Sequence, residues 1–293
     1  MSIAIYGRIN DRKNIVYLSN ILDVLRKNKK NFIIHKDLFD FANDILCFSS
    51  STVIFDKNTN LEKDNIEFFI SMGGDGTILE AVSYVRNNDI PIVGINLGRL
   101  GFLSSIPKED IDEALNELLK GNGIIEKRSL LSLITKENIF KNENYALNEI
   151  VVQKTDSSSM ITINAFVDDE YLNSYWADGL IISTPTGSTG YSLSCGGPII
   201  YPESKALIIT PIASHNLTVR PIIIPDDKMI KLVPEGRNNN FLIGLDSRNK
   251  TLKKSTEIII QKANFQVSFL TPKDNSYFKT LRNKLMWGND KRN

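Results

Sequence analysis

The stretch "ISMGGDGTILEA", residues 70–81, decides the fold expected of the first part of the chain. An apolar, strand-like run ends at Met72, three glycines surround Asp75, and a helix-like run follows. Glycine adopts positive φ and lets a ligand approach the backbone closely. The free N–H groups at the start of a helix attract phosphate. The stretch therefore predicts a strand, a phosphate-binding turn that includes Gly76, and a helix.

Asp75 needs an explanation, because a carboxylate beside a phosphate site repels the phosphate. Three tasks suit it: holding Mg²⁺, accepting a proton from a hydroxyl that attacks phosphorus, or hydrogen-bonding a ribose. The alternative is a structural aspartate that caps the following helix. Two glycines before Asp75 and one after it are more than a cap requires, which favours a functional role.

Strand and helix patterns alternate over the first 120 residues. Apolar runs predict strands at residues 2–8, 32–35, 66–72 and 89–96. Helical spacing predicts helices at residues 15–25, 76–88 and 108–123. Such alternation is typical of a mostly parallel sheet that is covered on both faces. Residues 1–123 are therefore expected to form an α/β domain with a Rossmann-like parallel sheet.

After Gly123 the pattern changes to short strands without long helices. The expected strands are residues 130–135, 146–153, 161–168, 179–184, 206–212, 221–225, 229–234, 241–246, 256–262 and 266–271. Residues 124–270 therefore predict an all-β domain, either a sandwich or an open barrel. The last stretch, residues 271–293, has a helical pattern through Tyr277, Leu281 and Leu285.

The composition excludes several classes of protein. Hydrophobic residues make up 42% of the 293, so the chain can form a core and is not expected to be disordered. Lys plus Arg is 35 and Asp plus Glu is 34, which gives no electrostatic case for nucleic acid or an anionic membrane. Two distant cysteines, the absence of a signal-peptide pattern and the absence of a long apolar run predict a cytoplasmic location.

A second unusual stretch is "WADGLIISTPTGSTGYSLSCGGPII", residues 176–200. A strand runs into Pro185 and then into a series of Thr, Gly and Ser residues that ends at Tyr191. Hydroxyls and bare backbone N–H groups are the donors that a pyrophosphate or a ribose uses, and Tyr191 can stack on a base. The alternative is a plain turn between two strands. The P-loop, Rossmann glycine, G-x-S-x-G and H-E-x-x-H motifs are absent, and two histidines make no zinc cluster.

Taken in order along the chain, these motifs resemble those of bacterial NAD kinases. The matching elements are "GGDGT" at 73–77, "NLGRLGFL" at 96–103, "LNEIVV" at 147–152, "DGLIISTPTGSTGYSLSCGGPI" at 178–199 and "LDS" at 245–247. The GGDG turn alone is less specific, because diacylglycerol kinases, sphingosine kinases and phosphofructokinases share it. The resemblance implies an α/β N-terminal domain, a sandwich-like β domain, and a C-terminal tail that packs back on the first domain.

The resemblance also implies roles for single residues. Asp75 matches the proton acceptor, and Asn148 and Glu149 match the pair that contacts the adenosine part of NAD. The residues that match the dinucleotide-binding loop and a small residue lining the site are Asp178, Thr186, Thr189, Gly190, Tyr191, Ser192, Leu193, Ser194 and Ala213.

Two further positions depart from the family pattern but are expected at the cofactor. Trp176 stands where many members carry a basic residue, and its ring can stack on another ring. Arg248 stands where many carry Gln, and its guanidinium can reach a phosphate. Asp246 belongs to the shared "LDS" motif without an assigned role. His215 either lines the site or satisfies a β-turn.

The expected function is that of an NAD kinase, which transfers the ATP γ-phosphoryl group to the 2′-hydroxyl of the adenosine ribose of NAD and forms NADP. The resemblance implies a divalent metal, Mg²⁺, and a homodimer or homotetramer. Two alternatives stay open: a catalytically silent dinucleotide sensor, and a lipid or sugar kinase that shares the GGDG turn.

Overall fold

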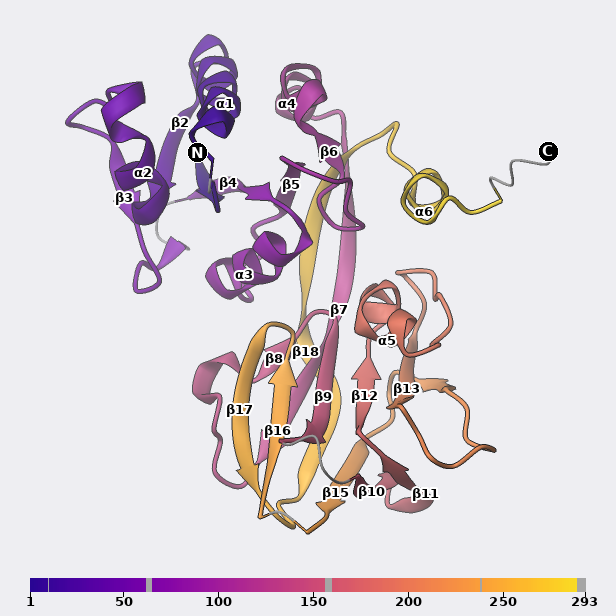
Figure 1. The fold of residues 1–293 in the computed structure, drawn as a ribbon. Helices are drawn as coiled ribbons and strands as arrows, with labels where there is room; N and C mark the ends of the chain where they lie inside the picture. Colours follow the sequence, from indigo (N-terminus) through magenta and orange to yellow (C-terminus); the bar gives the residue numbers. More distant parts are fainter. Residues whose placement is uncertain (10, 62–64, 156–159, 238, 289–293) are drawn as a thin grey trace. The chain divides into compact units, whose positions relative to one another are not determined.

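The computed structural model describes residues 1–9, 11–61, 65–155, 160–237 and 239–288. The chain divides into two compact units, residues 1–127 with 267–293, and residues 128–266 (Figure 1). The last five residues of the predicted C-terminal tail, 289–293, lie outside the described residues. Each unit is described by itself below.

The first unit is built on a parallel sheet with the strand order β3-β2-β1-β4-β5, and β6 also pairs with β5. Its strands are β1 (Ser2–Gly7), β2 (Asn31–His35), β3 (Val53–Phe55), β4 (Ile66–Gly73), β5 (Ile92–Asn96) and β6 (Ile106–Pro107). The α/β prediction for this part of the chain is confirmed. The strand order reverses between β1 and β4, so the chain leaves these two neighbours in opposite directions.

Five α-helices belong to this unit among the described residues, and the last of them follows the final strand of the chain. They are α1 (Ile15–Lys27), α2 (Lys36–Leu46), α3 (Asp75–Val85), α4 (Ile111–Leu119) and α6 (Tyr277–Leu285), with the short 3₁₀ helices η1 (Arg12–Asn14) and η3 (Lys108–Asp110). The sequence did not predict α2, because only Leu38 and Ala42 of its eleven residues are buried. Helix α6 belongs to this unit, and the Tyr277 ring lies 6.4 Å from the Phe102 ring.

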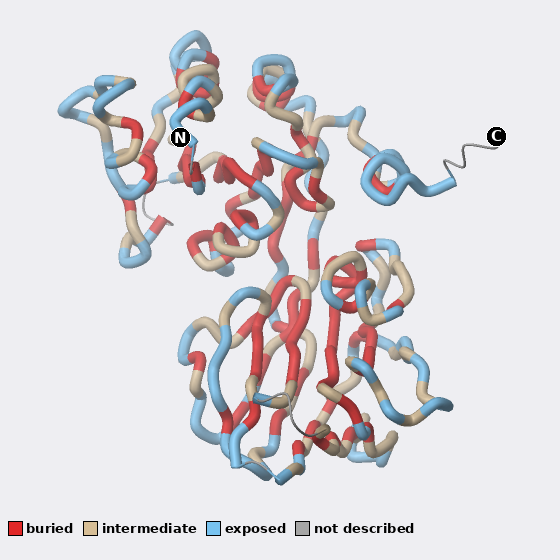
Figure 2. Tube along the Cα trace, in the orientation of Figure 1, coloured by how far each residue is buried: buried red, intermediate tan, exposed pale blue. Residues whose placement is uncertain are grey.

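Both faces of the parallel sheet are covered, because alternate side chains of β4 pack against different elements on the two faces. Phe68, Ile70 and Met72 join a core with residues of α1, α2 and α4. Phe69 faces the other side, where it packs against Tyr84 of α3 with ring centroids 6.1 Å apart. In Figure 2 the buried residues follow the strands of each unit, and most exposed residues lie on loops and outer helix faces.

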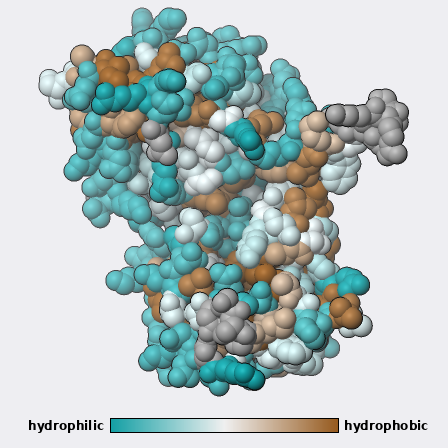
Figure 3. Space-filling model, in the orientation of Figure 1, coloured by the Kyte–Doolittle hydropathy of each residue, from teal (hydrophilic) through white to brown (hydrophobic). Residues whose placement is uncertain are grey.

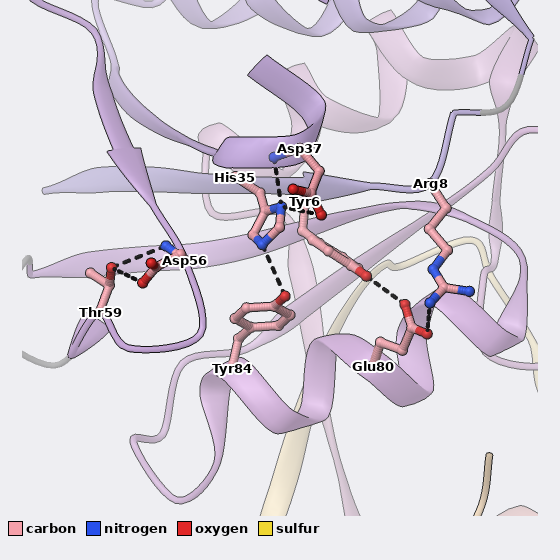
Figure 4. A network of polar contacts seen from close by, with 8 residues as sticks. All are labelled: Tyr6, Arg8, His35, Asp37, Asp56, Thr59, Glu80 and Tyr84. Atoms are coloured by element: carbon pink, nitrogen blue, oxygen red, sulfur yellow. Dashed lines mark hydrogen bonds and ion pairs between the residues drawn. The ribbon is translucent and has the colours of Figure 1, made fainter. Parts of the chain in front are cut away.

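A polar network fixes α3 on its face of the sheet (Figure 4). The Tyr6 hydroxyl donates to the Glu80 carboxylate over 2.5 Å, and Arg8 forms an ion pair with the same carboxylate. His35 Nδ1 accepts the Asp37 N–H, so its proton is on Nε2, which lies 2.9 Å from the Tyr84 hydroxyl. Burial lowers the pKa of His35 and raises the pKa of Tyr84 to about 12, so both are neutral at pH 7.

The second unit is a sandwich of two β-sheets. One is antiparallel with the order β14-β13-β12-β9-β16-β17, and the other contains β11-β10-β15-β18, with β7 pairing both β18 and β8. The strands are β7 (Gly123–Thr135), β8 (Tyr145–Ala146), β9 (Glu149–Lys154), β10 (Ile161–Val167), β11 (Glu170–Ala177), β12 (Gly179–Ser183), β13 (Ala206–Ile212), β14 (Ile222–Pro225), β15 (Ile230–Glu235), β16 (Asn240–Leu245), β17 (Arg248–Lys253) and β18 (Ile258–Pro272). One apolar core contains inward residues of both sheets, which confirms the predicted sandwich-like β fold.

Three details of the second unit differ from the sequence prediction. Residues 256–262 and 266–271 were expected as two strands but belong to the single strand β18. Strands β11 and β17 were not predicted; polar residues dominate β17, and only its Leu252 is buried. The short helices η4 (Lys141–Glu143), η5 (Thr186–Thr189) and α5 (Tyr191–Ser194) interrupt segments that were expected to be loops.

Two edge strands carry exposed hydrophobic residues. Val53 and Ile54 of β3 are exposed, as are Ile222 and Ile223 of β14. On the face drawn in Figure 3, hydrophobic residues form separate groups among hydrophilic ones. Among the described residues, no helix has both the length and the apolar character that crossing a bilayer would need.

Candidate functional site

The GGDG turn lies at the carboxyl end of β4, beside the end of β1. These two strands flank the point where the strand order reverses, and ligands of open α/β sheets bind at such a point. A Cβ at Gly7 would lie 2.9 Å from the Met72 Cβ, so the two strand ends approach each other closely. The fold therefore places Asp75 and Gly76 where an α/β sheet binds a nucleotide.

The turn itself requires glycine. Gly73 has φ +153°, and a Cβ there would lie 2.2 Å from Thr77 Oγ1. Gly74 is the N-cap of α3, and no side chain caps the helix. Asp75 is the first helical residue, so the interpretation of Asp75 as the helix cap is wrong.

The Asp75 carboxylate instead binds the loop at residues 102–104. Its Oδ1 accepts the N–H groups of Leu103 and Ser104, each over 3.0 Å, and the Ser104 hydroxyl over 3.1 Å. Its Oδ2 accepts the Phe102 N–H over 2.8 Å. A Cβ at Gly101 would lie 2.0 Å from Oδ1, so only glycine permits this approach. The carboxylate thus joins the GGDGT motif to the NLGRLGFL motif.

A buried asparagine supports the same loop. Asn96 ends β5, and its Oδ1 accepts the Gly98 N–H over 2.7 Å. Its Nδ2 donates to the Arg99 carbonyl over 2.5 Å and lies 3.2 Å from the Ser104 hydroxyl. The sequence prediction included the motif at 96–103 but missed Asn96 and Ser104 as individual residues. A polar residue at the end of a buried strand was the available signal.

In the second unit, strand register brings three segments to one end of the six-stranded sheet. Ser183 of β12 pairs with Glu149 of β9, and Leu245 of β16 pairs with Ile150. The loop that follows β12, the Asn148–Glu149 pair and Asp246 therefore lie together. Residues far apart in sequence meet here because antiparallel neighbours alternate in direction.

The loop after β12 packs directly on the backbone of the Asn148–Glu149 pair. Thr184 Oγ1 donates to the Leu147 carbonyl over 2.6 Å and accepts the Gly187 N–H over 3.1 Å. A Cβ at Gly187 would lie 2.1 Å from the Asn148 carbonyl oxygen. A Cβ at Gly190 would lie 3.0 Å from Glu149 Oε2. The glycines of the loop therefore allow contacts that a side chain would block.

The predicted loop residues differ in what they offer a ligand. Thr186 and Ser192 are buried, and the Ser192 hydroxyl is hydrogen-bonded to Thr210 over 2.8 Å. The Thr189 hydroxyl donates to the Thr186 carbonyl over 3.4 Å, and Leu193 is half-buried. Tyr191 and Ser194 are exposed. The most exposed of these residues are therefore Tyr191 and Ser194.

Two buried oxygens at this end of the sheet have no partner among the described residues. They are Oδ1 of Asn148 and Oε2 of Glu149. Burial and the nearby Asp246 together raise the pKa of Glu149 to about 8, and the Tyr191 N–H opposes the rise. Buried polar atoms in native proteins are normally paired, so these two oxygens are exceptions at this end of the sheet.

Asp246 supports the same pair from the end of β16. Its carboxylate accepts the N–H groups of Leu147, Asn148 and Glu149 over 2.9, 2.8 and 3.2 Å. Its own N–H donates to the Glu149 carbonyl over 3.1 Å, and its φ is +50°. The sequence placed Asp246 in a motif without a role, and the structure shows which backbone it holds.

A second group of predicted residues lies at the opposite end of β12. Gly179 pairs with Ile212 there, which places Asp178 near Ala213. The strand has five residues, so at roughly 3.3 Å per residue this group is about 16 Å from the Asn148–Glu149 pair. The Asp178 carboxylate forms an ion pair with Lys154 over 2.7 Å, and Ala213 is exposed with φ +45°.

Trp176 belongs to this second group and contacts His215. The two ring centroids are 4.4 Å apart, and the His215 N–H donates to the Trp176 carbonyl over 2.9 Å. Arg248 is engaged elsewhere: its guanidinium donates to the carbonyls of Glu143 and Tyr145 and lies 5.3 Å from the Tyr145 ring centroid. Cofactor contacts of Trp176 and Arg248 stay predictions.

Comparison with known proteins decides the family. The model of the ATP-NAD kinase N-terminal domain matches residues 25–123, and that of the ATP-NAD kinase C-terminal domain matches residues 147–271. An NAD kinase from Cytophaga hutchinsonii is 45% identical over 294 residues, which is 100% of both chains. The chain belongs to the NAD kinase family. Its activity is that of an NAD kinase, a phosphotransferase, and the expectation drawn from the motifs is confirmed.

Other relatives agree with this assignment. An NAD kinase from Bacteroides fragilis is 42% identical over 293 residues, again 100% of both chains. The crystal structure of yeast NADH kinase complexed with NADH has a TM-score of 0.85 at 23% identity, covers 99% of this chain and 89% of the other, and shows the fold. An NAD kinase from Archaeoglobus fulgidus in complex with ATP has a TM-score of 0.76 at 25% identity, with 98% and 99% covered.

Proposed function

We propose that the chain transfers the γ-phosphoryl group of ATP to the 2′-hydroxyl of the adenosine ribose of NAD and so forms NADP. The observation that carries this proposal is the orientation of Asp75. Four hydrogen bonds from residues 102–104 hold its carboxylate at the carboxyl end of β4. An acid held in this way can orient a poorly nucleophilic hydroxyl for attack on phosphorus.

Oδ2 of Asp75 is the oxygen that accepts the hydroxyl proton. A carboxylate offers about four acceptor positions, two on each oxygen. Oδ1 takes three donors from Leu103 and Ser104, whereas Oδ2 takes only the Phe102 N–H. Asp75 is half-buried, and Oδ2 is the oxygen that keeps a free acceptor position.

The Asn148–Glu149 pair is proposed to bind the adenosine part of NAD. Each residue has a buried side-chain oxygen without a partner among the described residues. This supports the assignment, because a bound nucleoside supplies donors and acceptors. Tyr191 is exposed, its backbone N–H acts on Glu149, and its ring is proposed to stack on a base. Gly76 of the GGDG turn, together with Thr186, Thr189 and the run Gly190 to Ser194, completes the proposed dinucleotide contacts.

The residues at the far end of β12 are proposed as a second group of dinucleotide contacts. The group contains Asp178, Ala213 and Trp176 with His215 against its ring. Arg248 is proposed to reach a phosphate, for which its guanidinium must leave the Glu143 and Tyr145 carbonyls.

Mg²⁺ is proposed to arrive with ATP. Among the described residues, no group of three or more His, Cys, Asp and Glu side chains could hold a metal ion. Mg²⁺ is often bound by substrate phosphates with only one or two protein carboxylates. The residues present therefore fit a metal–nucleotide complex as substrate, in which the metal neutralises phosphate charge.

The chain is further proposed to form a homodimer or homotetramer and to act in the cytoplasm. Exposed apolar residues on the edge strand β14 support a contact between copies. The free thiols of Cys47 and Cys195 suit a reducing compartment.

The test is the formation of NADP from NAD and Mg-ATP by the purified chain. We expect phosphorylation of NAD and none of diacylglycerol or fructose 6-phosphate. Turnover of either alternative without NAD phosphorylation would contradict the proposal, and binding of NAD without turnover would indicate a silent dinucleotide sensor.

A further inference from the structure

Asp246 and Glu149 are two neighbouring acids at one end of the six-stranded sheet. The Asp246 carboxylate accepts three consecutive N–H groups, from Leu147, Asn148 and Glu149. Glu149 is 9% exposed, and its Oε2 has no partner among the described residues. Two adjacent carboxyl groups away from water do not both ionise readily, because their charges repel each other.

The hydrogen bonds decide which of the two acids is ionised. Burial raises the pKa of Asp246, and its three N–H donors and the nearby Arg248 oppose this rise. The Glu149 carboxyl group has only one such donor, the Tyr191 N–H, to lower its pKa. Donors stabilise a carboxylate, so Asp246 is the charged member and Glu149 the neutral one.

We propose that Asp246 is a positioning residue that holds the Asn148–Glu149 pair and keeps Glu149 protonated, so that Glu149 donates a hydrogen bond from Oε2 to an acceptor atom of the dinucleotide. A neutral carboxylic acid can lie beside a diphosphate or a ring nitrogen without repelling it. The inference rests on the proposed binding of NAD by this pair and adds the protonation state in which it binds.

The groups around Glu149 come from several elements. Asp246 lies at the end of β16 and Arg248 at the start of β17, while Tyr191 and Cys195 come from α5 and the residue after it. Burial raises the pKa values of Tyr191 and Cys195, so both stay neutral at pH 7. Asp246 is therefore the charge that acts most directly on Glu149.

The sign of the pH dependence follows from the direction of the Glu149 shift. Its pKa is raised to about 8, so the protonated, donating form is present below pH 8 and is lost above it. If only this form binds, affinity for NAD falls by up to about tenfold for each pH unit above the pKa. NAD has no group of its own that titrates in this range.

The experiment measures the dissociation constant of NAD between pH 6.5 and 9.5 by calorimetry, with the complete chain and without ATP. For the wild type we expect constant affinity up to about pH 7.5 and a fall through pH 8. Glu149→Gln keeps an N–H donor and cannot ionise, so its affinity should not change with pH. Asp246→Asn removes the neighbouring charge, so the fall should move to lower pH.

Two variants serve as controls. Asp168 also has positive φ, at +49°, and its carboxylate accepts the Met229 N–H over 2.9 Å, but it contacts neither Asn148 nor Glu149. Asp168→Asn should therefore match the wild type at every pH. Cys195→Ser should also keep the pH midpoint, which excludes the thiol as the titrating group.

Three results would overturn the inference: constant wild-type affinity from pH 6.5 to 9.5, a fall that persists in Glu149→Gln, or an Asp246→Asn variant that loses affinity equally at all pH values. The last result is what a merely structural Asp246 would produce. If Asp246→Asn does not fold, the comparison of Glu149→Gln with wild type still decides the protonation state. Absence of NAD binding at every pH would overturn the proposed function as well.

Discussion

Replacing Asp75 by Asn separates the catalytic role of this carboxylate from its structural role. The substitution keeps the size of the side chain and exchanges one acceptor oxygen for an NH₂ group. The remaining oxygen can take the position of Oδ1 and accept the three donors of Leu103 and Ser104. The NH₂ group then faces the Phe102 N–H, which loses its acceptor.

The two consequences differ in size. An unpaired N–H in a half-buried position costs about 1–3 kcal/mol of folding free energy. That loss lowers the thermal midpoint by roughly 2–4 °C per kcal/mol for a domain of 150–250 residues. Loss of a general base typically lowers the rate by about 10²- to 10⁴-fold. The rate should therefore collapse in a protein that is folded and only moderately less stable.

The assay is kcat at saturating NAD and Mg-ATP, with thermal unfolding and NAD affinity measured on the same preparation. The matched control is Asp112→Asn, because Asp112 is an exposed acid in the first turn of α4. That variant loses a negative charge at a helix start without losing a described side-chain hydrogen bond, so its kcat should equal the wild-type value.

A kcat of Asp75→Asn within about threefold of the wild type would refute the catalytic role, since a base contributes about 10²-fold or more. A loss of kcat that raised Mg²⁺ restores would assign the carboxylate to the metal instead. A loss of kcat with intact NAD affinity and no rescue by Mg²⁺ is the expected result.

Asn148→Ala should weaken the binding of NAD by about 1–3 kcal/mol, because it leaves polar partners unpaired. The binding of ATP should change much less, and an equal loss of affinity for both nucleotides would contradict the assignment. Gly187→Ala should weaken NAD as well, because the new Cβ would lie 2.1 Å from the Asn148 carbonyl oxygen, whereas Gly98→Ala should fold normally because no atom lies within 4 Å of a Cβ there. Stability should fall with decreasing pH through His35, whose pKa is lowered by burial: the neutral form is favoured in the folded state, so its contribution is present above about pH 6.5 and is lost as the pH falls through the lower folded-state pKa. Chemical unfolding between pH 4.5 and 8 checks this, and His35→Gln should show a weaker pH dependence if the reasoning is correct.

The strand–turn–helix at residues 66–85 could be predicted from sequence because its determinants are local. A buried strand has a continuous apolar run, the turn at Gly73 needs a residue that tolerates φ +153°, and α3 has apolar residues at helical spacing. The motif order along the chain was also sufficient for the family. By contrast, α2 and β17 bury few residues, so their sequences carry little periodic signal.

Only the tertiary structure decided what the site residues contact. No local pattern shows that Asp75 binds residues 102–104, or that Asp246 accepts the N–H groups of residues 147–149, which lie almost 100 positions earlier. Sheet register placed Asp178 and the Asn148–Glu149 pair at opposite ends of β12, although all three match the same family's site motifs. The physical reason is that sequence periodicity reports which face of an element is buried, whereas the partners of a polar side chain depend on how distant elements pair and pack.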